Sequence, residues 1–405
     1  MATSLSFLFV FVLMTAYYIL RPVRDAMASD WSDVEVSWLW TINFFACTAL
    51  VAIYGWIVSR LPLRFVVPAV YTFFSLSFIS FYFSVWTGLT ADWVDKTFYV
   101  WVSVFALFHV SVFWSFMAET FNQNQAARLF SVIAAGASLG AIIGPLISAA
   151  LVQVLKPQSM MLVCAAMILI PLPISAKLYA LRGTDLENNN LSPVSPESSI
   201  GGNPLHGFVE FVTNPYLLGI GMFIILYTGI GSFVYLEQKN LLATYSRADR
   251  ATIYGIRDAV TNTITFALAF FVTGRLVPRL GMSVALVIVP ILIFLGMLIL
   301  AVSPVLTIAI ALWIARSAGN YGLVRPCREM LFTRVDRESR FKTKPVIDIV
   351  AYRGGDVIMA WFFSGLTQGL GLGMGGVGLV GAGLALLWGI IGFLLGRNFR
   401  DRSIA

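Results

Sequence analysis

The chain has 405 residues, of which 59% are hydrophobic and only 12% are charged. A soluble domain carries about 25% charged residues, so this composition excludes an ordinary soluble protein and indicates an integral membrane protein. The net charge is +7, but the basic residues lie between apolar runs and form no basic face or tail, which excludes nucleic-acid binding. Cys47, Cys164 and Cys327 lie in or beside apolar runs without metal-ligand spacing, so neither a disulfide framework nor a zinc site is predicted.

Membrane-spanning segments can be located as apolar runs, because a helix needs about 20 apolar residues to cross the hydrocarbon core. The chain contains twelve such runs, which predicts an all-α integral membrane protein with twelve transmembrane helices. The first run has no basic residue before it and no small-residue cleavage site, which favours a transmembrane helix over a cleaved signal peptide. The predicted spans are 5–27, 36–58, 64–87, 97–119, 129–154, 159–181, 215–237, 251–274, 282–302, 304–325, 345–369 and 375–396.

The longest polar interruption divides the twelve spans into two groups of six. Its sequence, RGTDLENNNLSPVSPESSIGGNP, is rich in Ser, Pro, Asn and Gly and is typical of a flexible linker. The predicted domains are an N-terminal six-helix bundle at 1–181, a cytoplasmic linker at 182–214 and a C-terminal six-helix bundle at 215–405.

The loops indicate how the chain is oriented. With both termini in the cytoplasm, sixteen loop lysines and arginines lie inside and five lie outside. Cytoplasmic loops are enriched in Lys and Arg, so the sequence predicts a multi-pass protein of the plasma (inner) membrane with both termini cytoplasmic.

Two pairs of loops share a register between the halves. VSRLPLRFVV after the second span matches TGRLVPRLGM after the eighth, with Arg60 and Arg64 each 215 positions before Arg275 and Arg279. FNQNQAARLF before the fifth span similarly matches FTRVDRESRF before the eleventh. This pattern indicates a duplicated six-helix unit, as in many secondary transporters. Twelve helices, a central linker and these short basic loops resemble the major facilitator superfamily, although Ser59 replaces the acidic residue that the superfamily has before the first basic one.

Eleven charged residues fall inside the predicted spans. Each costs about 3 kcal/mol on insertion scales unless it is paired or faces water, so we expect them to share a polar cavity that binds substrate. All the basic members are arginines, whose planar fork suits phosphate and carboxylate groups. The arginines are Arg21, Arg24, Arg257, Arg316, Arg325 and Arg353, and the acids, expected to act as coupling groups or charge partners, are Asp25, Glu237, Asp258, Asp348 and Asp356. The alternative is that these charges are paired structural contacts between helices.

Helical geometry predicts which of these charges meet. Arg353 and Asp356 are three residues apart and are expected to form a buried pair, with Asp348 on the same half of the helix. Arg257 and Asp258 are adjacent, so they point about 100° apart and are expected to meet different partners.

Two arginines precede prolines, and a proline disfavours helical geometry at the residue before it. Arg325 is followed by Pro326 and Arg21 by Pro22, which predicts a break near GNYGLVRPC and a bend in the first helix. Such breaks free backbone groups that can line a cavity.

The remaining motifs carry little chemistry. His109 in FALFHVSVFW is expected to be a packing residue more often than a proton relay. No nucleophile and base pair and no metal-ligand cluster is present, so an enzyme is not predicted, and no cofactor or metal site is expected.

Three strings resemble the ATP/ADP translocase family of plastids and intracellular bacteria. They are YYILRPVRD, FWSFMAETFNQNQAARLFSVI and GNYGLVRPCREMLFTRVDRESRFKTKPVIDIVAYRGG, which together cover about a fifth of the chain. The first matches that family's pattern of Leu-Arg, two residues, a basic residue and Asp at Leu20, Arg21, Arg24 and Asp25.

This resemblance implies a nucleotide exchanger, with ATP and ADP among its solutes. It implies roles in exchange for Arg24 and Glu237. In the tenth span, however, Asn320 stands where the translocases have lysine, and Arg325 with Pro326 stands where they have Asp-Pro. Asn320 therefore joins the candidate substrate-binding residues through the resemblance, and these departures allow a different substrate.

The leading hypothesis is a secondary transporter that moves a small anionic solute by alternating access, through exchange or proton coupling. One alternative is proton-coupled efflux of a hydrophobic or cationic compound, in which the acidic residues would be primary. The other is a membrane scaffold or sensor without transport activity. The expected partners are the solute and the lipid bilayer, and the sequence indicates no particular protein partner.

Overall fold

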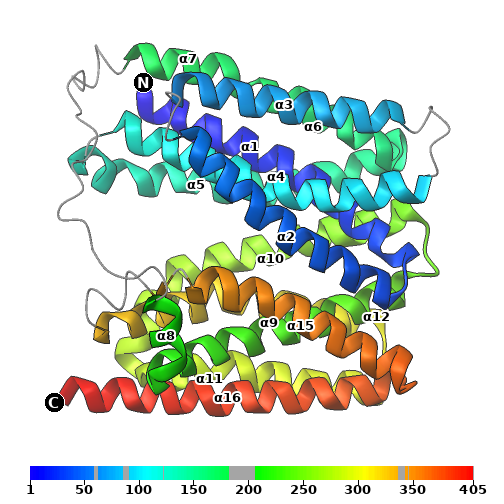
Figure 1. Ribbon diagram of the computed structural model, residues 1–405, viewed down its shortest axis with the longest axis vertical. Coiled ribbons are helices and arrows are strands. Elements are labelled where there is room, and N and C mark those ends of the chain that lie inside the picture. Colours follow the sequence, from blue (N-terminus) through cyan, green and yellow to red (C-terminus); the bar gives the residue numbers. More distant parts are fainter. Residues whose placement is uncertain are drawn as a thin grey trace. The chain divides into compact units, whose positions relative to one another are not determined.

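The computed structural model describes residues 1–58, 63–84, 91–121, 123–181, 206–335, 343–344 and 346–404. Every regular element within these ranges is a helix (Figure 1), so the all-α prediction is confirmed. Most of the predicted linker, residues 182–205, lies outside the described ranges. Its last part is not an irregular linker, because His206–Thr213 form a short helix, α8.

The helices described before the linker are α1 (Ala2–Met27), η1 (Ala28–Asp30), α2 (Asp33–Val58), α3 (Leu63–Ser84), α4 (Ala91–Thr120), α5 (Gln123–Leu155), η2 (Pro157–Ser159), α6 (Met160–Leu169) and α7 (Pro171–Leu181). Those after it are α8, α9 (Pro215–Leu242), α10 (Arg247–Phe271), α11 (Thr273–Val302), α12 (Leu306–Gly319), η3 (Asn320–Val324), α13 (Arg325–Leu331), η4 (Phe332–Arg334), η5 (Val346–Ala351), α15 (Tyr352–Ser364), η6 (Gly365–Gly369) and α16 (Met374–Ile404).

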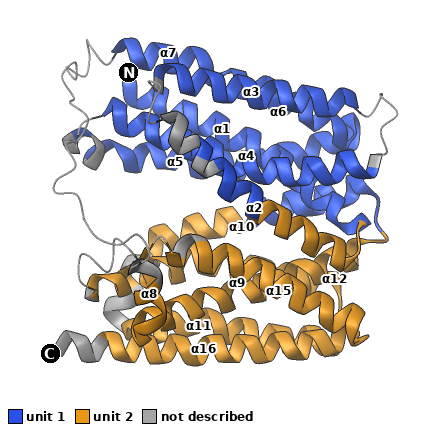
Figure 2. Cartoon of the chain, viewed as in Figure 1, with its two compact units in different colours: residues 1–30, 45–197, 245–260 blue, residues 31–44, 198–244, 261–405 orange. Residues whose placement is uncertain are grey.

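The helices form two compact units, coloured separately in Figure 2. Unit 1 contains residues 1–30, 45–197 and 245–260, and unit 2 contains residues 31–44, 198–244 and 261–405. Two helices, α2 and α10, each contribute one segment to each unit. The first half of α10 therefore belongs with the N-terminal helices, although it lies far from them in sequence.

Within the described residues, each of the twelve predicted spans falls on one helix or on consecutive helices. Eight of the described helical segments are long and apolar enough to cross a membrane. The predicted tenth and eleventh spans are interrupted by π-helical turns, which leave α12 with 14 residues and α15 with 13. α10 is long enough, but its first half carries several charges. Four predicted spans have no counterpart among these eight segments: three of them carry charged residues, whereas the second, 36–58 on α2, carries none.

A row of glycines on α5 brings that helix close to α1 in unit 1. Gly136, Gly140 and Gly144 are four residues apart, so they lie on one face of the helix. A Cβ atom added to Gly140 would lie 2.5 Å from the carbonyl oxygen of Phe11, and one on Gly144 would lie 2.7 Å from that of Thr15. Small residues at this spacing allow the close backbone contact that stabilises helix pairs in lipid.

Aromatic side chains form the core between α1, α3 and α4. The ring of Phe9 meets that of Phe113 at 5.2 Å, and Phe74 meets Phe105 at 5.1 Å. His109 belongs to this core: its ring stacks on Phe105 at 4.9 Å, and its Nδ1 donates a hydrogen bond of 2.9 Å to the Phe105 carbonyl. These contacts agree with the predicted packing role of His109.

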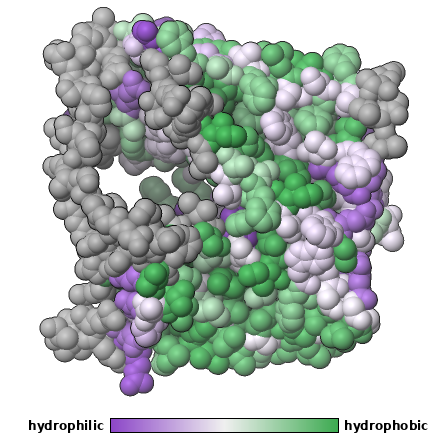
Figure 3. All heavy atoms as spheres, viewed as in Figure 1, coloured by the Kyte–Doolittle hydropathy of each residue, from purple (hydrophilic) through white to green (hydrophobic). Residues whose placement is uncertain are grey.

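In unit 2, the exposed surface of α16 consists mainly of apolar side chains, as expected for a surface that faces lipid. Figure 3 shows hydrophobic residues along most of this helix. Its large exposed apolar side chains are Leu379, Leu386, Leu387, Ile390, Phe393 and Leu394. Apolar side chains outside and internally bonded backbone inside are the arrangement that hydrocarbon requires.

The glycine row predicts that Gly140→Leu destabilises unit 1. The added side chain would meet the α1 backbone, which cannot move aside as a side chain can, so we expect a loss of about 1–3 kcal/mol or more. Thermal unfolding in detergent measures the change. Gly383→Leu on α16 is the matched control, because nothing lies within 4 Å of a Cβ atom at Gly383. Equal losses in the two variants would contradict the packing role.

Candidate functional site

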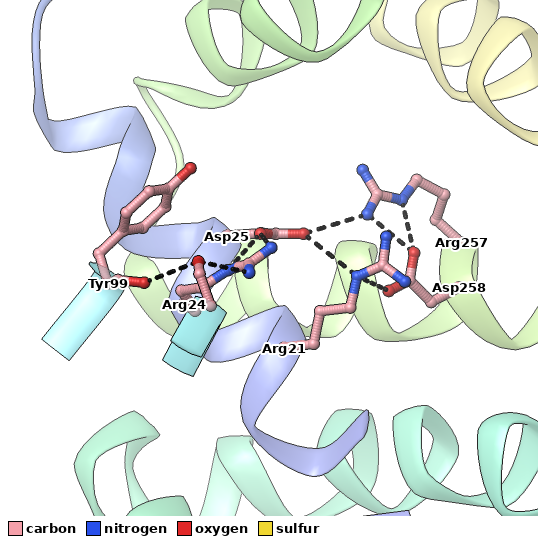
Figure 4. Close-up of polar contacts among 7 residues, drawn as sticks. Arg21, Arg24, Asp25, Tyr99, Arg257 and Asp258 are labelled. Carbon is pink, nitrogen blue, oxygen red and sulfur yellow. Dashed lines mark hydrogen bonds and ion pairs between the residues drawn. The ribbon is translucent and has the colours of Figure 1, made fainter. Parts of the chain in front are cut away.

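The charged residues of the α1 motif meet the first half of α10 in unit 1 (Figure 4). Asp25 is 1% exposed and its carboxylate lies between guanidinium groups. Arg24 donates to Oδ1 of Asp25 at 2.6 Å, and Nη2 of Arg257 lies 3.4 Å from Oδ2. The Nε atom of Arg21 lies 3.9 Å from the same oxygen. One carboxylate therefore forms ion pairs with three arginines, which come from two helices distant in sequence.

Arg257 and Asp258 are paired with each other, which corrects the prediction that they meet only different partners. Nε and Nη2 of Arg257 lie 3.0 and 2.8 Å from Oδ1 of Asp258. The side chains leave the helix in different directions, but the arginine is long enough to turn back onto its neighbour. The prediction holds in one respect, since each residue also has a separate partner: Asp25 for Arg257 and Arg21 for Asp258.

Backbone packing brings Arg257 to this position. Gly255 lies two residues before it, and a Cβ atom at Gly255 would lie 2.7 Å from the carbonyl oxygen of Pro145 on α5. The glycine therefore allows α10 to pack closely against α5. The face of the Tyr254 ring lies 4.4 Å from the Arg257 guanidinium carbon and covers it, which is a favourable cation–π contact.

Arg21 is the least engaged arginine of the cluster. Its side chain is 22% exposed, and its nearest acid is Asp258, with 3.3 Å between Nε and Oδ2. Its contacts with the described acids are ion pairs without hydrogen-bond geometry, and its buried Nε has no hydrogen-bond partner among the described residues. The five side chains carry three positive and two negative charges, so one positive charge remains unbalanced within the cluster. This charge and these donors are suited to binding an anion.

In unit 2, Arg316 occupies a pocket of aromatic rings. It donates through Nη1 to the Tyr227 carbonyl at 3.2 Å, and its guanidinium carbon lies 4.6 Å from the Tyr227 ring and 5.2 Å from that of Trp313. Gly231 on α9 makes the room, because a Cβ atom there would lie 2.5 Å from Nη1. Arg316 is 7% exposed, and no described carboxylate lies within 4.0 Å of it.

The predicted break near GNYGLVRPC is confirmed as a π-helical segment, Asn320–Val324. Asn320 is buried and begins this segment. Arg325 corrects a prediction, because its backbone is helical, with φ −62° and ψ −48°. The wider π turn before it gives the Pro326 ring the space that a regular α-helix lacks. The Arg325 side chain is exposed and lies 5.9 Å from the Tyr321 ring.

The predicted bend at Pro22 does not interrupt α1, which runs from Ala2 to Met27 with this proline inside it. The eleventh span contains a π-helical turn, Val346–Ala351, that was not predicted from the sequence.

The predicted ion pair between Arg353 and Asp356 is not formed. Both side chains are half-buried, and the described part of unit 2 contains no contact within 4.0 Å between them. Gly355 allows α9 to approach α15 closely beside them, because a Cβ atom there would lie 3.3 Å from the Ile225 Cα, whereas Gly354 faces open space. The side chain of Asp348 is outside the described residues.

Two acidic residues around the α1–α2 turn were missed by reasoning from hydropathy. In unit 1, Asp30 accepts from Arg247 and Arg250, each at 2.6 Å. In unit 2, Asp33 accepts from Lys239 at 2.9 Å and from Thr367 at 3.0 Å. These residues lie at helix ends, where charges are usual, so hydropathy does not single them out. The signal that could have suggested the contacts is that acids gather in the α1–α2 turn and bases around the α9–α10 turn.

The comparisons with known proteins agree with this architecture. Residues 6–335 match the model of the Major Facilitator Superfamily, so the chain belongs to this superfamily. Among solved structures it is similar to a bacterial homolog of the human lysosomal transporter Spinster, in an inward-facing and unoccupied conformation. That match has 17% identity and a TM-score of 0.66, and covers 99% of this chain and 98% of the homolog.

The nucleoside transporter NupG is also similar, with 12% identity and a TM-score of 0.66 over 97% of this chain and 98% of NupG. The chain has no match among curated proteins. These findings confirm the predicted fold class and identify a membrane transporter.

The position of Asp25 predicts that Asp25→Asn strongly destabilises unit 1. Removing one partner of a buried charge network leaves the other charges uncompensated, which costs about 3 kcal/mol or more. Thermal unfolding in detergent measures this loss. Asp249→Asn is the control, since Asp249 is an exposed residue that accepts from Ser246 and Gln153 and is expected to contribute less than about 1 kcal/mol. A mild effect at Asp25 would contradict the bridging role.

Proposed function

We propose that the chain is a secondary transporter that moves a small anionic organic solute across the plasma (inner) membrane by alternating access. Each unit contains an arginine of the predicted site that is at least half-buried and keeps donors that the described protein groups do not use. These residues are Arg21 in unit 1 and Arg316 in unit 2. A guanidinium group with free donors in a low-dielectric region is the group that recognises phosphate or carboxylate. This observation carries the proposal.

The other candidate residues have supporting roles in this proposal. Asp25 and Asp258 hold Arg24 and Arg257 in place. Because both acids already contact guanidinium groups, they are poorly suited to bind a cationic compound, which disfavours the efflux alternative. Asn320, Arg325 and Arg353 supply further polar contacts in unit 2. The orientation with cytoplasmic termini rests on the basic loops.

A nucleotide or another phosphorylated metabolite is the proposed class of solute. The motif YYILRPVRD contains Arg21, Arg24 and Asp25, three of the five cluster residues, and it also carries the resemblance to the ATP/ADP translocases. The structural relative NupG is named a nucleoside transporter. Movement by exchange against a second anion and movement coupled to protons both fit these arginines.

The proposal predicts that the purified protein is stabilised by anions and that Arg21 is required. Thermal shift measurements would compare inorganic phosphate, AMP, ADP, ATP and citrate. Arg21→Ala is expected to raise the Kd of a stabilising anion about tenfold or more, because a hydrogen bond to a charged group contributes about 1.5–3 kcal/mol. Lys96→Ala is the control, since Lys96 pairs with Asp92 near the start of α4. Stabilisation by none of these anions would contradict the proposal.

A second prediction uses Gly231 to move Arg316 without removing its charge. In Gly231→Ala the new methyl group would meet the guanidinium, the far end of a flexible side chain, so the helix remains and the arginine shifts. Anion affinity is expected to fall by several-fold to about tenfold, as the loss of about one hydrogen bond implies. Gly383→Ala, in open space on α16, should leave the affinity unchanged. Equal affinity in both variants would exclude Arg316 from binding.

A further inference from the structure

Glu237 is a buried carboxyl group to which no other described group is bonded. It lies on α9 in unit 2 and is 1% exposed. Both of its carboxyl oxygens are buried without a hydrogen-bond partner in the described part of the chain. It differs in this respect from Asp25, Asp30 and Asp33, which each contact at least one basic side chain. An acid in this environment has no local source of stabilisation for a negative charge.

The charged groups around α9 do not compensate Glu237. On its own helix, Lys239 bonds to Asp33 and to the Trp31 carbonyl, and it points about 200° away around the helix axis. The described charged side chains of the elements packed against α9 are Asp33 and Glu35 on α2, Arg316 on α12, Arg353 and Asp356 on α15, Glu210 on α8 and Arg397 on α16. None of them forms an ion pair with Glu237. The π-helical turn Val346–Ala351 also packs on α9, and its Asp348 side chain is not described.

An ionised carboxylate without a partner in an apolar interior costs several kcal/mol, whereas the protonated acid is neutral. We infer that Glu237 is a proton-binding site: it holds a proton in this conformation and releases it when the transport cycle exposes it to water. This inference rests on the proposed function and specifies its coupling, since it selects proton coupling over exchange of two anions.

The proton moves in the same direction as the anionic solute in this mechanism. On one side of the membrane the carboxylate takes up one proton, and on the other the carboxyl group returns it to water, so no bond of the solute is changed. One positive charge then accompanies the anion. This reduces the electrical work of crossing, which is about 2.3 kcal/mol per charge per 100 mV.

Infrared difference spectroscopy at neutral pH measures whether the Glu237 carboxyl group is protonated, and it requires no solute. In Glu237→Gln we expect the loss of the carbonyl band of a protonated carboxyl group. The matched control is Glu329→Gln. Burial raises the pKa of Glu329, but hydrogen bonds from Lys344 and Arg328 outweigh this effect and lower it, so this variant should lose carboxylate bands only. Loss of carboxylate bands in Glu237→Gln would overturn the inference.

Transport in proteoliposomes tests the coupling, with the anion that the thermal shift measurements select. When the exterior is about one pH unit more acidic than the lumen, accumulation of the anion in the lumen should rise up to about tenfold, because one pH unit is a tenfold ratio of proton activity. Glu237→Gln should lose this increase. It should still exchange labelled for unlabelled anion across the membrane, because this exchange requires no net movement of protons. An unchanged response of the variant to the gradient would overturn the coupling role.

The two proposals can fail separately. If none of the five anions is bound, the proposed function fails, and the infrared measurement still decides whether Glu237 holds a proton. If anions are bound and Glu237 is ionised, the proposed function stands and the inference is overturned.

Discussion

A charged side chain inside a membrane is stable only when an opposite charge or water is within reach, and in unit 1 this requirement is met at Asp25. Its carboxylate lies between Arg24 on one side and Arg21 and Arg257 on the other (Figure 4). Without it, Asp258 would be the one remaining acid of the cluster, and it contacts only two of the three arginines, Arg21 and Arg257. The close approach of α5 to α1 and to α10, at Gly140 and Gly255, brings these side chains into range. Backbone packing and charge balance therefore depend on each other.

The two units stabilise buried arginines in different ways. In unit 1 the guanidinium groups face carboxylates, as Arg257 does with Asp258. In unit 2 Arg316 faces the rings of Tyr227 and Trp313 and a backbone carbonyl. Aromatic faces attract a cation without neutralising its charge, so Arg316 remains attractive to an anion although it is buried. Among the described residues of unit 2, neither Glu237 nor Asp356 forms an ion pair with Arg316.

Spacing along the helices was a poor guide to which of the charged residues pair. Spacing of three residues predicted a pair between Arg353 and Asp356, yet no such pair is formed among the described residues. Adjacency predicted separate partners for Arg257 and Asp258, yet they bond to each other. Helical periodicity gives the direction of a Cβ atom. The partner of a long arginine side chain depends in addition on its rotamer and on which acceptors the neighbouring helices place within reach. The contacts of Asp30 and Asp33 were missed for another reason: these residues lie at helix ends, where charges are usual.

The sequence by itself determined the membrane class, the helical fold, the break at Asn320–Val324 and the charged residues of α1, α9, α10, α12 and α15, because apolar runs of helix length and the cost of charge in lipid are local properties. The resemblance to the major facilitator superfamily, read from spans and loops, agrees with the family match. Only the tertiary structure decided that Asp25 meets α10 and that, among the described residues, Arg21 keeps free donors and Glu237 has no hydrogen-bond partner. These are contacts between helices more than 200 positions apart, or the absence of such contacts, and periodicity along one helix carries no information about them.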